Sequence, residues 1–358
     1  MGIVAKVAAV LKNGGREVLL LFRQSNAPDL RISVTMKSLM HSPYPIQSSD
    51  GLTHAVIIPS IGFTCIEFVT HVNEQRVSVL DSDPEFLTGT CRPGRSGIPI
   101  LFPFPNRIRD GRFAYLGKTY EVQPPTWFPQ TIHGFCLDQP WRVIDSTPQS
   151  ITGEFLLSRD APERQAQWPA DARLIVKYSV KSAQLRADIT VENPDAVPLP
   201  WGFGTHPYFT LPLGNGSAED CVIRAAAAEQ WELVQCFPTG QRLPPAPEKD
   251  LRSGWRYGSC TLDDVYTGLE VVDGVITQSI EDLGSQLRMT QSCGPEFREL
   301  VLFTPPQRSV ICLEPYTCST DAANLQSQGL NAGWRELAPG QQTSLWFEIE
   351  ILPLESSL

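Results

Sequence analysis

The sequence predicts a large all-β protein built from antiparallel sheets. Three observations support this prediction: apolar and polar residues alternate with period two in many segments, Gly and Pro are abundant, and no long amphipathic helical pattern separates the alternating segments. The 358 residues include 26 Gly and 31 Pro. Because Pro removes an amide donor and Gly costs backbone entropy, this composition disfavours helical bundles and coiled coils.

Two segments, 184–192 and 345–351, show the alternation most clearly. Successive side chains of a strand point to opposite faces, so each segment has one apolar and one polar face. The apolar residues are Leu185, Ala187, Ile189 and Val191 in the first segment, and Leu345, Phe347, Ile349 and Ile351 in the second. The segment FAYL-GK-TYEV, at 113–122, predicts a hairpin that turns at Gly117. Many such strands in one chain predict two packed sheets.

The first fifty residues differ from the rest of the chain. They mix Lys, Arg and Ser with short apolar patches and show no sustained alternation. We therefore divide the chain into an N-terminal extension at 1–50, whose structure the sequence does not define, and a β-sandwich domain at 51–358. The total length is within the range of one large domain.

The net charge of the chain argues against nucleic acid as a ligand. With 39 acidic and 29 basic side chains, the formal net charge is −10, so nucleic acid is not an expected ligand. No apolar run approaches the roughly 18 residues that span a bilayer, so no membrane segment is expected either. The sequence does not define the oligomeric state, and we expect a monomer or a homodimer.

The nine cysteines include no C-x-x-C pair, and an odd number cannot all form disulfides within one chain. We therefore expect free thiols in a reducing cytoplasm. No cluster of Cys and His has the spacing of a zinc site, so no metal is expected.

Two of the five histidines have unusual neighbours. His133 lies in TIHGF and His206 in WGFGTHPYF, beside Gly and aromatic residues that favour a cavity wall where the backbone can approach a ligand. The alternative is that each is a core histidine whose ring nitrogens are both satisfied.

Three further segments carry charged groups in apolar surroundings. Glu314 ends a strand-like apolar run. Desolvation there would raise its pKa and make it a better proton acceptor near neutral pH. The alternative is an edge glutamate paired with an arginine. Arg107 follows two Phe-Pro steps, and its guanidinium is either paired or open to an oxygen-rich ligand. Asp263 and Asp264 are adjacent, so at most one of them points into a given cavity.

These segments together resemble the aldose 1-epimerase family, the sugar mutarotases. The resemblance rests on ordered blocks: GIPILFPFPNRIRDGRF at 97–113, TIHGF at 131–135, WGFGTHPYFTLP at 201–212, LDDVYTGL at 262–269, LEPYTCSTDAANL at 313–325 and LAPGQ at 337–341. It implies a β-supersandwich of large antiparallel sheets with a sugar cleft across one of them. It covers the chain from about Gly51 onward.

The resemblance also implies roles for individual residues. Glu314 would be the general base that removes the anomeric proton, and His206 the general acid that protonates the ring oxygen, with His133 helping to polarise it. Arg107, Asn106 and Asp263 would hold sugar hydroxyls, with Asp263 preferred to Asp264. Because mutarotation removes one proton and delivers another, it needs an acid and a base but no cofactor.

Two other functions remain possible on the sequence alone. One is a non-catalytic sugar-binding or sensor protein with the same fold, which would bind a sugar without accelerating anomer exchange. The other is a glycoside hydrolase that uses Glu314 with Asp263 or Asp264 as its two carboxylates, although the two histidines would then have no required role.

Overall fold

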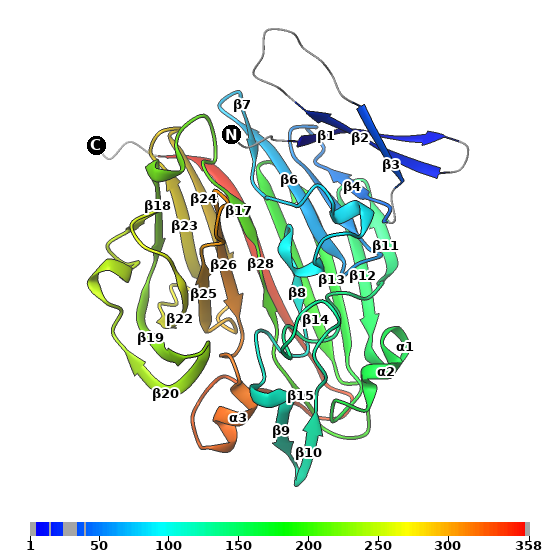
Figure 1. Ribbon diagram of the computed structural model, residues 1–358, viewed down its shortest axis with the longest axis vertical. Helices are drawn as coiled ribbons and strands as arrows, with labels where there is room; N and C mark the ends of the chain where they lie inside the picture. Colours follow the sequence, from blue (N-terminus) through cyan, green and yellow to red (C-terminus); the bar gives the residue numbers. More distant parts are fainter. Residues whose placement is uncertain (1–4, 14–15, 24–33, 39–40, 355–358) are drawn as a thin grey trace.

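The computed structural model describes residues 5–13, 16–23, 34–38 and 41–354, with side chains from residue 41 onward. Two large antiparallel sheets, of nine and eight strands, dominate the described part of the chain. Figure 1 shows their strands running in roughly the same direction, with β9, β10 and α3 at one end of the molecule. The predicted all-β fold class is confirmed.

The nine-stranded sheet has the order β11-β12-β13-β14-β28-β24-β23-β18-β21. Its strands are β11 (Arg142–Thr147), β12 (Ser150–Leu156), β13 (Arg173–Lys181), β14 (Gln184–Glu192), β28 (Gln342–Pro353), β24 (Leu287–Cys293), β23 (Ile276–Asp282), β18 (Cys221–Ala225) and β21 (Trp255–Arg256).

The eight-stranded sheet has the order β20-β19-β22-β25-β26-β16-β8, with β17 also pairing with β26. Its strands are β20 (Phe237–Leu243), β19 (Ala227–Val234), β22 (Asp263–Leu269), β25 (Glu299–Phe303), β26 (Val310–Tyr316), β16 (Gly204–Thr205), β8 (Ile100–Leu101) and β17 (Tyr208–Thr210).

Smaller elements complete the fold. A four-stranded sheet contains β4 (Tyr44–Gln47), β5 (His54–Ile58), β6 (Thr64–Val72) and β7 (Gln75–Ser78), and two pairs are formed by β9 (Arg112–Tyr115) with β10 (Lys118–Glu121) and by β15 (Leu199–Trp201) with β27 (Arg335–Leu337). The helical segments are α1 (Leu157–Asp160), α2 (Pro162–Gln165), α3 (Ala322–Ser327), η1 (Phe86–Thr88), η2 (Pro93–Arg95), η3 (Arg109–Gly111), η4 (Ala218–Asp220) and η5 (Pro247–Lys249).

The segment after β7 joins the four-stranded sheet to the eight-stranded sheet. The amide of Val79 donates to the carbonyl of Phe68 in β6 (2.9 Å), and the carbonyl of Val79 accepts from the amide of Thr210 in β17 (3.0 Å). The amide of Asp81 donates to the carbonyl of Tyr208 (2.9 Å). The two sheets therefore form one continuous layer opposite the nine-stranded sheet.

The core fills the space between these layers, and the predicted alternation accounts for it. The predicted apolar faces are buried, with Leu185, Ala187, Ile189, Val191, Leu345, Phe347, Ile349 and Ile351 at most 2% exposed. The two segments are neighbouring strands, β14 and β28, with Ile189 opposite Leu345. Both contribute to the same core cluster as Ile311 and Leu313 of β26.

The predicted hairpin at Gly117 is confirmed. Tyr115 of β9 pairs with Lys118 of β10, which leaves Leu116 and Gly117 as the two turn residues. Both have positive φ, 47° and 78°, as in the type I′ turn that suits the twist of a two-stranded hairpin.

The N-terminal region contains β1 (Ala5–Asn13), β2 (Arg16–Arg23) and β3 (Val34–Ser38), which form a three-stranded sheet of their own. β4 precedes Gly51 and pairs with β5. The side chains of residues 1–40 lie outside the described part, and the division of the chain at residue 51 stays a prediction.

Two chemical features complete the description. All nine cysteines are free thiols, as the sequence predicts. Among the described residues, no helix is long and apolar enough to cross a membrane.

Replacing Phe347 by Ala should lower the free energy of unfolding by about 3 to 5 kcal/mol, because it leaves a cavity between the sheets beside Tyr178. Urea denaturation followed by tryptophan fluorescence measures this. The control is Leu352→Ala, at a residue that is 38% exposed on the same strand, and it should change stability by less than about 0.5 kcal/mol. Equal losses in the two variants would contradict the assignment of the core face.

Candidate active site

Glu314 lies on β26, an interior strand of the eight-stranded sheet. Ile311 and Leu313 belong to the core between the layers, so Cys312, Glu314 and Tyr316 point to the outer face of the sheet. Only 1% of Glu314 is exposed. β26 pairs with β25 on one side and with β16 and β17 on the other, so the alternative of an edge glutamate is wrong.

His206 lies directly opposite Glu314. Tyr208 of β17 pairs with Cys312 in antiparallel register, and stepping two residues along each strand brings His206 opposite Glu314. Nε2 of His206 is 3.2 Å from Oε1 of Glu314. The register of β26 with β16 and β17 therefore creates this pair.

Neighbouring groups fix the orientation of the His206 ring. It stacks on the ring of Tyr208 with centroids 4.8 Å apart and planes 9° from parallel, and it meets Phe303 edge to face at 6.2 Å. Its backbone amide donates to the carbonyl of Pro99 (3.0 Å). The imidazole is thus held by both packing and backbone before any ligand binds.

His133 reaches the same place from a loop. It has a positive φ of 64°, and its amide donates to the carbonyl of Asn106 (2.8 Å). A Cβ on the following residue, Gly134, would lie 2.1 Å from the carbonyl oxygen of Phe102, so only Gly fits there. The close approach brings the ring of His133 to 5.6 Å from that of His206, edge to face.

Arg107 extends the site away from the histidines. Its Nη1 donates to Oδ1 of Asn106 (3.0 Å) and its Nε to Oε1 of Gln130 (3.1 Å). Its guanidinium also lies 5.9 Å from the centre of the Phe128 ring. The positive charge of Arg107 lowers the pKa of Glu314, which places the two groups within electrostatic reach of each other.

Asp321 anchors the backbone on both sides of Arg107. The amide of Asp321 donates to the carbonyl of Arg107, and its Oδ1 accepts from the amide of Arg109, both at 2.9 Å. Nδ2 of Asn324 donates to the same Oδ1 (2.7 Å). These bonds fasten the start of α3 to the loop that carries Arg107.

The two adjacent aspartates point in opposite directions. Asp263 pairs with Phe303, which pairs with Cys312, so all three share the outer face with Glu314. Asp264 faces the other way, where both its carboxylate oxygens accept from Nζ of Lys249 at 2.8 and 2.9 Å. Of the two, only Asp263 is free to meet a ligand at the site. Its assignment as a sugar ligand stays a prediction.

Burial determines the protonation of the Glu314–His206 pair. It raises the pKa of Glu314 well above the usual value, and the nearby charge of Asp263 raises it further, whereas the hydroxyl of Tyr316 donates to Oε2 and lowers it, as does Arg107. Burial also lowers the pKa of His206 to about 3. Because each shift disfavours the charged form, the two shifts favour a pair of neutral groups with the proton on Glu314.

The interpretation of the two histidines as satisfied core residues is wrong. Within residues 41–354, Nδ1 of His133 and Nδ1 of His206 are buried without a hydrogen-bond partner. Burial lowers the pKa of His133 well below its ordinary value, and the charges of His206 and Arg107 lower it further. Both rings therefore offer unpaired nitrogens inside the site.

The same groups include a candidate metal-binding set. In the described part of the chain, His206, Cys312 and Glu314 are the one set of three donors close enough for a metal, within 4.8 Å of one another. The bond between His206 and Glu314 already explains their approach, and burial raises the pKa of the Cys312 thiol far above the range in which it would be a thiolate ligand. The donor set therefore suits proton transfer better than metal binding.

The structure brings together Glu314, His206, His133, Arg107, Asn106 and Asp263, leaves Asp264 facing away, and adds other residues. Tyr316 and Cys312 were missed, although the alternation in VICLEPY places them on the same face as Glu314. Gln130 was also missed, because no local pattern relates it to Arg107, 23 positions away.

A sandwich of two large antiparallel layers, with a buried His–Glu pair on the outer face of one of them, is a galactose mutarotase-like fold. A galactose mutarotase-like protein from Clostridium acetobutylicum superposes with a TM-score of 0.76 at 23% identity, over 88% of this chain and 99% of that one. An aldose epimerase homologue from C. elegans gives 0.73 at 16% identity, over 88% and 100%. The expected β-supersandwich is confirmed.

The chain belongs to the aldose 1-epimerase family, whose sequence profile matches residues 47–350. Among individual sequences, it is 30% identical over 230 residues to the uncharacterized protein YihR of Escherichia coli K12, covering 63% of this chain and 71% of that protein. It is 28% identical over 170 residues to the uncharacterized YphB of the same organism, covering 45% and 54%. The family resemblance seen in the sequence is confirmed.

Acidification should destabilise the protein through its buried histidines. Their pKa values in the folded state are lowered, so they contribute stability that is present above about pH 6.5 and is lost as the pH falls toward 3. Urea unfolding at pH steps from 7 to 4 should show a shallower loss for His133→Asn than for the wild type, since Asn tolerates the positive φ and does not take up a proton. The exposed His71→Asn is the control. Identical slopes in all three proteins would contradict the prediction.

Proposed function

We propose that the protein is an aldose 1-epimerase, which interconverts the α and β anomers of a neutral aldose such as glucose or galactose. The observation that carries the proposal is the buried pair of His206 and Glu314 on the outer face of the sheet, with Nε2 of the imidazole 3.2 Å from Oε1 of the carboxyl group. Mutarotation removes a proton from the anomeric hydroxyl and delivers one to the ring oxygen, so a pair with one proton to give and one site to receive matches its stoichiometry.

The steps follow from this pair. The pKa shifts favour the proton on Glu314, so the reactive form arises when that proton moves across the 3.2 Å contact to His206. Glu314 is then a carboxylate that takes the proton of the anomeric hydroxyl, while His206 protonates the ring oxygen as the C1–O5 bond breaks. The open aldehyde rotates about C1–C2 and closes from the other face, with the two proton transfers reversed. Each transfer contributes a factor of roughly 10² to 10⁴.

Two neighbours favour the charge distribution that these steps need. The hydroxyl of Tyr316 donates to Glu314, and the positive charge of Arg107 lowers its pKa, so both stabilise the carboxylate against the cost of burial. Asp263 acts in the opposite direction. The charges of Asp263 and Arg107 are opposite, so a neutral sugar that hydrogen-bonds to both meets little net charge.

The same residues would hold the substrate. Arg107 and Asp263 offer a donor and an acceptor to sugar hydroxyls, and Asn106 fixes the guanidinium through its Oδ1. His133 would polarise the ring oxygen beside His206, since the rings lie 5.6 Å apart. No group here requires a bound cofactor for the proton transfers.

The composition of the site also argues against glycoside hydrolysis. That reaction needs two carboxyl groups, and Glu314 and Asp263 share one face, but it gives no required role to His206, which lies 3.2 Å from Glu314. We further place the protein in a reducing compartment such as the cytoplasm, because all nine cysteines are free thiols.

Replacing Glu314 by Gln should lower the rate of mutarotation by about 10² to 10⁴, because it removes the proton acceptor. Polarimetry of freshly dissolved α-D-glucose and α-D-galactose measures the rate, and calorimetry should show that sugar binding remains. Glu350→Gln, on the other sheet, is the control and should keep the wild-type rate. An unchanged rate in Glu314→Gln would sink the catalytic assignment, and saturable binding by a wild type that accelerates neither sugar would indicate a sensor.

Replacing Tyr316 by Phe should shift the acidic limb of the kcat/KM profile upward by roughly one pH unit. The sign follows from the lost hydrogen bond, since Tyr316 lowers the pKa of Glu314 and its removal lets that pKa rise. Activity lost near pH 6 should return at higher pH. Tyr266→Phe, which removes a hydroxyl bonded to the carbonyl of Lys249, is the matched control. A uniform loss at every pH would mean that Tyr316 has only a structural role.

A further inference from the structure

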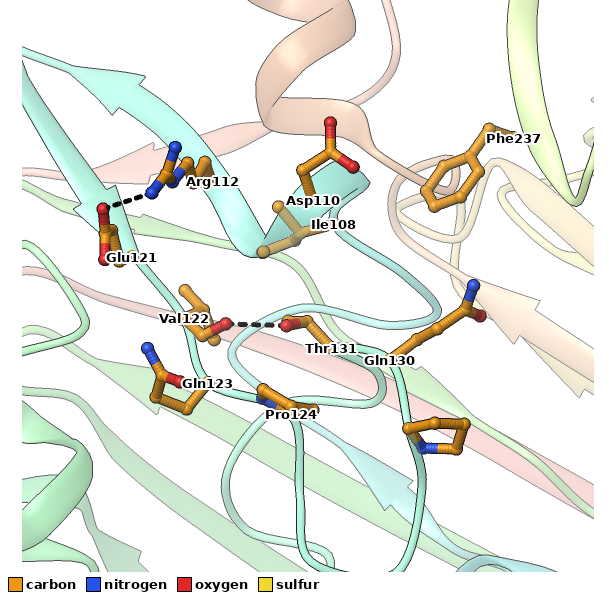
Figure 2. Close-up of a pocket in the computed structure, with 12 residues that line it drawn as sticks. Ile108, Asp110, Arg112, Glu121, Val122, Gln123, Pro124, Gln130, Thr131 and Phe237 are labelled. Atoms are coloured by element: carbon orange, nitrogen blue, oxygen red, sulfur yellow. Dashed lines mark hydrogen bonds and ion pairs between the residues drawn. The ribbon is translucent and has the colours of Figure 1, made fainter.

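A cavity of about 340 Å³ lies beside the candidate active site. Figure 2 shows its walls, which come from residues 108–112, from the loop at 121–131 and from Phe237 at the start of β20. None of the residues expected from the sequence to bind or transform the sugar lines it. The cavity is therefore a separate compartment.

Gln130 connects the cavity with the site. It lines the cavity, and its Oε1 accepts from Nε of Arg107 at 3.1 Å. Thr131 also lines the cavity, and His133 lies only two residues further along the chain. The cavity is thus linked to Arg107 through Gln130.

The shape of the cavity is formed in advance. Its floor contains Gly111, with φ of 64°, where a Cβ would lie 2.5 Å from the carbonyl oxygen of Val122. The hydroxyl of Thr131 donates to the same carbonyl at 2.6 Å, as Figure 2 shows. A ligand would therefore meet a wall whose backbone is already fixed.

The lining matches a neutral polyhydroxylated ligand. The half-buried ring of Phe237 lies at the edge of the cavity, with the guanidinium of Arg109 4.4 Å from its centre. Within residues 41–354, the carboxylate of Asp110 has no hydrogen-bond partner, whereas Arg112 and Glu121 form an ion pair at 2.9 Å. One unpaired carboxylate repels a phosphate or carboxylate group but accepts from hydroxyls, and an aromatic face packs on the C–H face of a sugar ring.

We infer that this cavity is a subsite for a second sugar unit, so the preferred substrate is the reducing end of a disaccharide or longer oligosaccharide. The inference rests on the proposed function. C1 and the ring oxygen of the reducing sugar must face Glu314 and His206, so the opposite side of that ring faces Arg107 and the cavity beyond it. The additional sugar is accordingly attached through a carbon remote from C1, at position 4 or 6.

Polarimetric kcat/KM values for maltose and melibiose, which are linked through positions 4 and 6, test the inference against glucose. At least one disaccharide should exceed glucose. Phe237→Ala should lower kcat/KM for that disaccharide by about tenfold and leave glucose unchanged. Asp110→Asn is a second variant at another lining residue, with the same expected selectivity. Val272→Ala, at an exposed apolar residue outside the cavity, is the control and should alter neither sugar.

The outcomes separate this inference from the proposed function. Glucose acceleration without any advantage for either disaccharide, or an equal effect of Phe237→Ala on all sugars, would overturn the subsite and leave the epimerase intact. Calorimetric binding of maltose that is tighter than that of glucose and is weakened by Phe237→Ala, without acceleration of either sugar, would support the subsite and overturn the epimerase. Absence of both binding and acceleration would overturn both.

Discussion

An imidazole and a carboxyl group that are both removed from water can coexist at low cost only while the pair carries no net charge. His206 and Glu314 meet this condition, and the rest of the site is arranged around it. The register of β26 brings the two groups together, Tyr208 holds the ring, and Tyr316 and Arg107 adjust which partner carries the proton. In a solvated pair with the same geometry, the two pKa values would stay near their usual values. Proton exchange with a sugar hydroxyl would then be less favourable.

One face of β26 packs in the core and the other face lies at the candidate site. In β26, Ile311 and Leu313 contribute to the core, and Glu314 and Tyr316 face the site, so the packing that stabilises the fold also fixes the catalytic candidates. The loop residues need other anchors because no ladder holds them. His133 relies on the close approach of Gly134 to the backbone, and the chain around Arg107 is fastened by backbone and side-chain bonds to the start of α3.

The sequence predicts most of what depends on local pattern. Alternation identifies β14 and β28, positive φ at Leu116 and Gly117 fits the expected hairpin, and the ordered blocks lead to the family and to the candidate residues. Features that depend on distant pairing could not be predicted. The choice between Asp263 and Asp264 requires the register of β22, and the cavity beside Gln130 forms only when Phe237 meets the distant segments around the β9–β10 hairpin. The left-handed backbone of His133 was not predicted from the sequence either.

The position of β28 has a consequence for how the chain reaches this structure. β28 lies in the middle of the nine-stranded sheet, between β14 and β24, although it follows both in the chain. During synthesis, β14 and β24 each present an open hydrogen-bonding edge until β28 has left the ribosome. Folding of this sheet is therefore completed only after nearly the whole described chain has been made, with the slow, non-local search that high contact order implies. Until β28 pairs with them, the unpaired edges of β14 and β24 are the part of the nascent chain most exposed to mispairing with another molecule.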